Sequence, residues 1–183
     1  MRPLYLGSPL GLRTTLSGVG IASYLIAVPL LAWGAAKLSS LNVTTALAAG
    51  ALSSGLMLVS DWLHQLGHAR AARRTGYPMI GIHFSSPFAI SVYPADEPQI
   101  PSELHMRRAL GGFWVNLVVG LLLAPAAIYL WPRGGLLAWL AGFTSVFNFF
   151  VIGLGALLPI DIPGVFTIDG GTLLRYWRES RKT

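Results

Sequence analysis

Four long apolar stretches constrain the fold of this chain more than any other feature of its sequence. They cover residues 18–36, 43–63, 109–131 and 136–160. Each is close to or above the roughly 20 residues that a helix needs to cross a bilayer. The composition agrees, because 54% of the residues are hydrophobic and only 11% are charged. We therefore predict one domain, 1–183, that is an all-α membrane protein with about four transmembrane helices, at about 18–36, 43–74, 106–131 and 136–160.

The basic residues are distributed unequally between the two sides of such an arrangement. One side receives only Lys37 and Arg133. The other side receives Arg2, Arg13, Arg70, Arg73, Arg74, Arg107, Arg108, Arg175, Arg178, Arg181 and Lys182. Because basic residues concentrate on the cytoplasmic side of membrane proteins, we expect both termini to face the cytoplasm, with the protein in a prokaryotic plasma membrane. This asymmetry accounts for the net charge of +6, so the charge gives no reason to expect a nucleic-acid partner.

The segments between the apolar stretches are short, except for one loop at residues 75–106. Residues 79–93 of this loop alternate apolar and polar side chains around a turn at Pro87, which predicts a short β-hairpin on the cytoplasmic side. Residues 94–102 are rich in proline and acid and indicate an irregular loop. Residues 1–17 are expected to form a cytoplasmic arm or an interfacial segment.

The second apolar stretch leads directly into His64-Gln65-Leu66-Gly67-His68. Two histidines four residues apart lie on one face of a helix, so both can reach one metal ion. In the zinc-protease motif His-Glu-x-x-His, the glutamate is the general base. Gln65 occupies that position here, and an amide has no useful acid–base chemistry at neutral pH. The pattern therefore predicts a metal site that lacks its usual catalytic base.

The order of these features resembles the site-2 protease family of intramembrane zinc metallopeptidases, over nearly the whole chain. After the histidine motif, residues 67–76 (GHARAARRTG) resemble the family's glycine- and arginine-containing pattern. Residues 112–116 (GFWVN) partly match its Gly-Pro-x-x-Asn pattern, and residues 168–171 (IDGG) stand where the family has Leu-Asp-Gly. The resemblance implies one Zn²⁺ held by His64, His68 and Asp169, and a transmembrane-helix substrate or partner protein in the lipid bilayer.

Three departures from the family pattern bear on activity. Gln65 replaces the catalytic glutamate, and Phe113 replaces the proline of Gly-Pro-x-x-Asn. The family's later Asn-x-x-Pro pattern would place Ala156 at the asparagine position. Asn148 lies two turns earlier and could take over only if the helix breaks there. We therefore consider Asn116 and Asn148 as candidates for binding the substrate or the oxyanion.

Other polar residues have simpler explanations. Asp61 lies three residues before His64, so it either orients His64 from behind the metal or faces a polar cavity. His83 and His105 are expected to be interfacial loop residues rather than ligands. Glu97 and Glu103 could in principle replace the missing base, but a solvated acidic loop is the simpler explanation for them.

Three functions remain open on the sequence alone. The first is an intramembrane zinc protease, a hydrolase that cleaves transmembrane helices, in which Gln65 is an engineered or tolerated change that leaves it weakly active or inactive. The second is a natural pseudoprotease that binds membrane-protein partners without cleavage. The third is a channel or a metal-handling membrane protein.

Overall fold

The computed structural model describes residues 2–86, 88–162 and 166–181. Pro87 of the expected turn and Lys182 of the basic tail therefore lie outside the described residues. Four segments in the described part are long and apolar enough to cross a membrane. They are Gly18–Ser39, Val43–Arg74, Ser102–Arg133 and Gly135–Leu157. The prediction of a mainly helical membrane protein with four transmembrane helices is confirmed.

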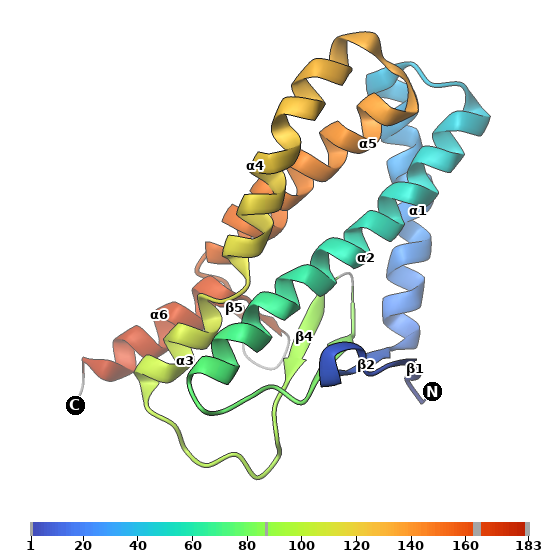
Figure 1. The fold of residues 1–183 in the computed structure, drawn as a ribbon. Helices are drawn as coiled ribbons and strands as arrows, with labels where there is room; N and C mark the ends of the chain where they lie inside the picture. Colours follow the sequence, from blue (N-terminus) through green and yellow to red (C-terminus); the bar gives the residue numbers. More distant parts are fainter. Residues whose placement is uncertain (1, 87, 163–165, 182–183) are drawn as a thin grey trace.

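The long helices form an elongated bundle (Figure 1). Its members are α1 (Gly18–Ser39), α2 (Val43–Arg74), α4 (Phe113–Leu130) and α5 (Gly135–Val146). Capping residues determine where α1 and α2 begin. The side chains of Ser17 and Asn42 accept hydrogen bonds from Gly20 N and Thr45 N, both at 2.9 Å. These are N-caps of the ordinary kind.

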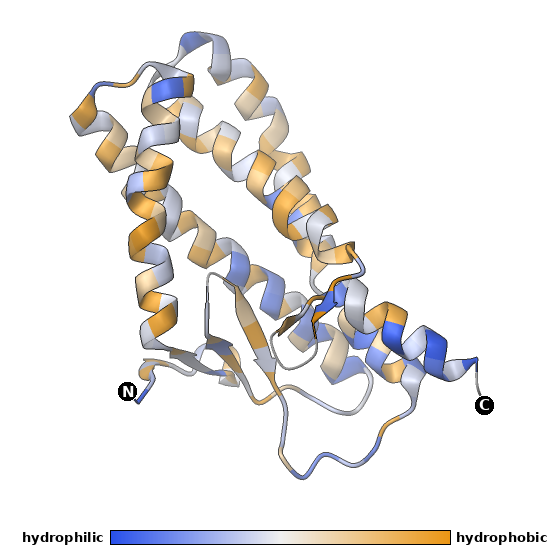
Figure 2. Ribbon diagram, turned by 180° about the vertical axis from the view of Figure 1, so that it is seen from behind, coloured by the Kyte–Doolittle hydropathy of each residue, from blue (hydrophilic) through white to orange (hydrophobic). Residues whose placement is uncertain are grey.

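Close packing between α1 and α2 depends on small residues. A Cβ atom on Gly50 would lie 2.3 Å from the carbonyl oxygen of Val28, so only glycine fits there. Small residues at helix contacts let backbones approach closely inside a membrane. The outer surfaces of the helices are apolar, and Figure 2 shows hydrophobic residues along them, with hydrophilic residues gathered on the C-terminal helix α6 (Asp169–Ser180).

The sheet is larger than the sequence predicted. It has four strands in the order β1 (Leu4–Gly7), β2 (Arg13–Leu16), β3 (Gly81–Phe84) and β4 (Ala89–Val92). The expected hairpin is β3 and β4, which pair antiparallel. The N-terminal segment is not a free arm, because β1 and β2 form a hairpin around the turn Pro9–Gly11 and β2 pairs parallel with β3. Ile82 and Phe84 anchor the sheet in the core.

Two expected helices depart from a single regular α-helix. The third expected helix consists of α3 (Ser102–Ala109) and α4, separated by a turn that contains Gly111 and Gly112. The fourth continues from α5 into a π-helical segment, Phe147–Leu154, and a 3₁₀ turn, Gly155–Leu157. A two-stranded ribbon of β5 (Asp161–Ile162) and β6 (Phe166–Thr167) then leads into α6.

The sheet, α3, α6 and both chain ends lie at one end of the bundle (Figure 1). The connections between α1 and α2 and between α4 and α5 lie at the other end. The two termini are therefore on the same side of the bundle, as four crossings require.

Candidate metal centre

Three side chains from distant parts of the chain meet beside the end of α2. They are His64 and His68 of α2 and Asp169, the first residue of α6, and one ligand atom from each lies within 4.8 Å of the others. The Nε2 atoms of His64 and His68 are 3.0 Å apart, and each lies 3.2 Å from an oxygen of Asp169. Both histidines are buried. The structure therefore brings together the three residues that the sequence analysis proposed as metal ligands.

Hydrogen bonds fix the tautomers of both histidines. His64 donates from Nδ1 to Oδ1 of Asn116 at 2.9 Å, and His68 donates from Nδ1 to the carbonyl oxygen of Arg108 at 2.8 Å. In a neutral imidazole the other nitrogen then carries a lone pair. The two Nε2 atoms therefore point lone pairs at each other and at a carboxylate.

This donor set suits a divalent cation. Three lone-pair atoms that face one another need positive charge between them, and Oδ2 of Asp169 is buried without a hydrogen-bond partner. A carboxyl group is ordinarily ionised at neutral pH, so Asp169 offers an anionic ligand atom. Two nitrogens and one carboxylate, with a fourth position open, are typical of catalytic zinc sites.

Glycines bring the ligand-bearing segments close together. A Cβ atom on Gly112 would lie 2.4 Å from Nε2 of His64, and one on Gly170 would lie 2.2 Å from the carbonyl oxygen of Leu157. The turn before α4 and the start of α6 can therefore approach the site only because these positions lack side chains. A stacked contact between His105 of α3 and Tyr176 of α6, with ring centroids 3.9 Å apart, also holds α6 in place.

Asn116 and Asn148 form a buried chain of amides behind His64. Asn116 donates from Nδ2 to Oδ1 of Asn148 at 2.8 Å, and Asn148 donates to Oγ of Ser60 at 2.9 Å. Both asparagines have 0% exposure. Asn148 comes from the π-helical segment, which continues the helix instead of breaking it. In this structure the two amides bind each other, and Asn116 also binds His64.

Asp61 does not orient His64, contrary to one of the two expectations for it. Its Oδ2 accepts a hydrogen bond from the backbone amide of Ala89 in β4, and the Nδ1 position of His64 is taken by Asn116. Gln65 also contacts β4. Its Nε2 donates to the carbonyl oxygen of Ala89 at 2.9 Å, and its Oε1 accepts from Oγ of Ser91 at 2.8 Å.

The remaining candidates lie outside this cluster. Glu97 forms an ion pair with Arg108, whose hydrogen bonds lower the pKa of Glu97, and Glu103 is exposed. His83 is hydrogen-bonded to Thr15 on the sheet, at 2.8 Å. Among the described residues, no contact brings Glu97 or Glu103 into a position to act as the base.

Sequence reasoning missed two contributors to the site. Ser60 lies four residues before His64, on the same face of α2, so helical spacing could have identified it. Arg108 acts through its backbone carbonyl, and no pattern of residue types reveals such a role. Its side chain is buried and lies over the ring of Tyr93, with the guanidinium carbon 4.0 Å from the ring centroid.

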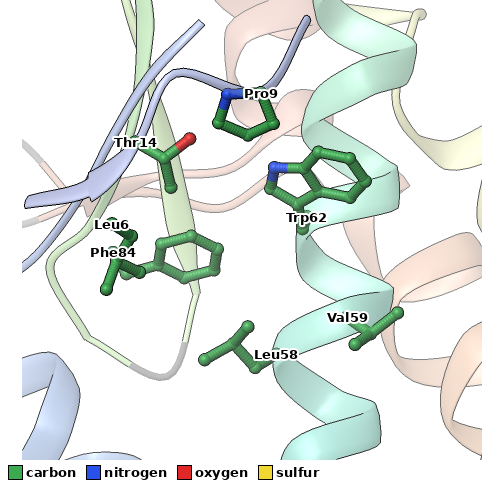
Figure 3. Close-up of a pocket in the computed structure, with 7 residues that line it drawn as sticks. All are labelled: Leu6, Pro9, Thr14, Leu58, Val59, Trp62 and Phe84. Carbon is green, nitrogen blue, oxygen red and sulfur yellow. The ribbon is translucent and has the colours of Figure 1, made fainter.

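An apolar hollow of about 220 Å³ lies between the sheet and α2. Figure 3 shows Trp62 and Leu58 of α2 facing Phe84 of β3 and Pro9 of the N-terminal turn across it. The metal-centre residues do not line this hollow. It is thus separate from the histidine and aspartate cluster.

No family model matches the sequence, and no curated protein matches it either. Among solved structures, the site-2 protease from Methanocaldococcus jannaschii is similar, with a TM-score of 0.65 and 22% sequence identity. The match covers 98% of this chain and 73% of the other. At this identity the similarity is one of fold. The chain is an integral-membrane protein with the fold of a site-2 protease.

Proposed function

We propose that this protein is a zinc-binding, site-2-protease-like membrane protein that binds a transmembrane segment of a partner protein and cleaves it slowly or not at all. The observation that carries the proposal is the convergence of His64, His68 and Asp169, with their ligand atoms within 4.8 Å. The resemblance in motif order and the similarity of fold support the same reading.

His64, His68 and Asp169 would hold one Zn²⁺. When bound, the ion supplies a Lewis acid that can polarise a carbonyl group. Asn116 and the carbonyl of Arg108 keep both imidazoles in the tautomer that a metal requires. Such partners behind the ligands orient them and raise their basicity.

Gln65 is the reason to expect weak cleavage. Peptide hydrolysis at such a site needs a group that removes a proton from water and returns it to the leaving amine, and such a group typically contributes roughly 10²–10⁴-fold. The amide of Gln65 can do neither, and both of its ends are hydrogen-bonded to β4. Glu97, which could have replaced it, is paired with Arg108.

The membrane setting indicates the class of partner. The site lies at the end of a bundle whose outer surface is apolar, so a transmembrane helix that moves within the bilayer can approach it laterally. The distribution of basic residues supports an orientation with this end toward the cytoplasm. The third possibility, a channel or a metal-handling protein, has no feature of its own in the described residues that favours it over partner binding.

Elemental analysis of protein purified in detergent tests the metal. We expect about one zinc per chain in the parent, and its loss in His68→Ala and Asp169→Ala. His83→Ala is the matched control, because it removes a hydrogen-bonded histidine of the sheet and should leave zinc content unchanged. Equal zinc in the parent and in His68→Ala, or no zinc in either after loading, contradicts the proposal.

A further inference from the structure

Strand β4 lies at the edge of the four-stranded sheet, with β3 on its only strand-paired side. In an antiparallel pair, successive residues turn their backbone groups alternately toward the partner strand and away from it. The carbonyl of Val92 faces β3, because it accepts from the amide of Ile80 at 2.9 Å. Ala89, three residues earlier, therefore turns its N–H and C=O groups outward, and Ser91 has the same orientation.

Helix α2 provides the hydrogen-bond partners of Ala89 on this outward side. The N–H of Ala89 donates to Asp61, and its C=O accepts from Gln65 at 2.9 Å. Asp61 and Gln65 are four residues apart, so they project from one face of the helix, one turn apart. Together they give Ala89 the same two hydrogen bonds that a neighbouring strand would give.

Glutamine suits this arrangement and glutamate does not. Gln65 uses its amide nitrogen as a donor to Ala89 and its amide oxygen as an acceptor for Ser91. A glutamate carboxylate only accepts hydrogen bonds, so it would face the carbonyl oxygen of Ala89 without a proton between them. Gln65 is only 4% exposed, and such a mismatch is costly in a buried position.

We propose that Asp61 and Gln65 form a clamp on the Ala89 peptide, which keeps the edge of β4 beside the metal centre closed to an added extended segment. Exposed strand edges otherwise take up extended peptides through backbone hydrogen bonds. A partner that stays helical does not need this edge, whereas a partner that unwinds must first displace the clamp. The idea deepens the proposed function, and it rests on that proposal only for the nature of the partner.

Hydrogen–deuterium exchange of the parent protein in detergent provides the first test. Edge-strand amides normally exchange quickly, because they lack backbone partners. We expect the amide of Ala89 to exchange slowly, in both zinc-loaded and chelator-treated protein. Exchange as fast as that of the exposed loop around Pro94 would overturn the proposal without any variant.

Two variants then test the role of Gln65. Gln65→Glu keeps the shape and removes the donor to Ala89, and Gln65→Met removes both polar contacts without adding a charge. We expect β4 to exchange about fivefold faster or more in each, the size of effect expected for the loss of one buried hydrogen bond. Ser54→Ala is the matched control, because it removes a buried α2 bond of 2.8 Å to the backbone of α1 and should leave β4 unchanged.

A binding measurement tests whether the edge is closed. The probe is a dansyl-labelled peptide of alternating threonine and valine, added to chelator-treated protein so that cleavage does not interfere. We expect the peptide to bind Gln65→Glu at least about tenfold more tightly than it binds the parent or Ser54→Ala. Unchanged exchange of β4 in both Gln65 variants, or equal binding by the parent, would overturn the clamp. Zinc content is measured on the same samples. A failure of the proposed zinc binding is therefore distinguished from a failure of the proposed clamp.

Discussion

At position 65, the difference between a carboxylate and an amide decides which chemistry the site can support. The neighbouring histidines are placed for a metal, and their Nδ1 atoms are both occupied by fixed acceptors. The side chain between them binds β4 instead of presenting a base. Metal binding and proton transfer thus depend on different residues. A change at position 65 alone can remove proton transfer and leave the geometry of the candidate metal ligands intact.

Gln65→Glu is therefore expected to raise proteolysis. A positioned general base contributes roughly 10²–10⁴-fold, and the same change opens the clamp on β4. Cleavage of a membrane-embedded model substrate measures the effect, with His64→Ala in the Gln65→Glu background as the control. Strong zinc-dependent cleavage by the parent would show that another group is the base. Inactivity of both forms would favour a pseudoprotease.

Asn116→Leu should weaken zinc binding by roughly 10–100-fold, the usual effect of losing a partner that orients a ligand. The reason is that Asn116 alone fixes the Nδ1 of His64 among the hydrogen bonds of the described residues. Competition with a fluorescent chelator gives the affinity. Asp61→Asn is the control, since an asparagine oxygen can still accept from Ala89, and its zinc affinity should match the parent. If Asp61→Asn weakened zinc binding and Asn116→Leu did not, Asp61 would be the residue that orients His64.

The sequence predicted which residues meet at this candidate site, but it did not predict most of their hydrogen-bond partners. His64, His68 and Asp169 were candidates because metal ligands are restricted to few residue types and because two of the three share a helix face. The partner of Asp61 was not recognisable, because it is a backbone amide 28 residues away. Asn116 was singled out by motif as a candidate for substrate or oxyanion binding, but its bond to His64 depends on how α4 packs against α2.

At the scale of elements, the position of the third candidate ligand, Asp169, depends on where α6 begins. Asp169 is its first residue, and Gly170 and Gly171 lie against the backbone of the segment that follows α5. A Cβ atom on Gly171 would lie 2.1 Å from the carbonyl oxygen of Ile160. The ion pair between Arg175 and Asp161 ties the first turns of α6 to β5. The position of the carboxylate is therefore set by backbone contact rather than by its own hydrogen bonds.

Gly170→Ala should displace α6 and remove zinc. Its Cβ atom would lie 2.2 Å from the oxygen of Leu157, a backbone atom that cannot move without shifting the chain. Zinc content and thermal unfolding measure the effect. Gly55→Ala is the control, because nothing lies within 4 Å of a Cβ there and alanine favours a helix by about 1 kcal/mol. Retention of full zinc content in Gly170→Ala would show that α6 tolerates the side chain.

Elements with strong local signals were predictable, and elements that depend on distant pairing were not. The second helix, 43–74, matches α2, because a long apolar run preceded by a capping asparagine determines it. The strands β1 and β2 were missed, since β2 is stabilised by parallel pairing with β3, 68 residues further on, as in the bond from Thr15 to His83. The π-helical segment around Asn148 has no signal in hydrophobic periodicity.

At the scale of the whole molecule, most of the charged residues lie at one end, and Lys37 and Arg133 lie at the other. The sheet, α3, α6 and the metal centre share the more charged end, and both chain termini lie there (Figure 1). The opposite end consists of two short connections. With an even number of membrane crossings, the two termini must lie on the same side of the membrane. The orientation in the membrane is then a single binary choice, which the basic residues indicate.

Cysteine labelling tests that choice directly, because the chain contains no cysteine. Ser40→Cys and Arg133→Cys lie at the end with few basic residues, and both positions are exposed. We expect a membrane-impermeant maleimide to label them from outside intact cells. Arg74→Cys and Arg181→Cys are exposed at the other end and should be labelled only after the membrane is permeabilised. The reverse pattern would place the metal centre on the outer side, where zinc and partner segments would have to arrive from outside the cell. Labelling of all four positions from one side would contradict four crossings, because the two ends of the bundle would then share a compartment.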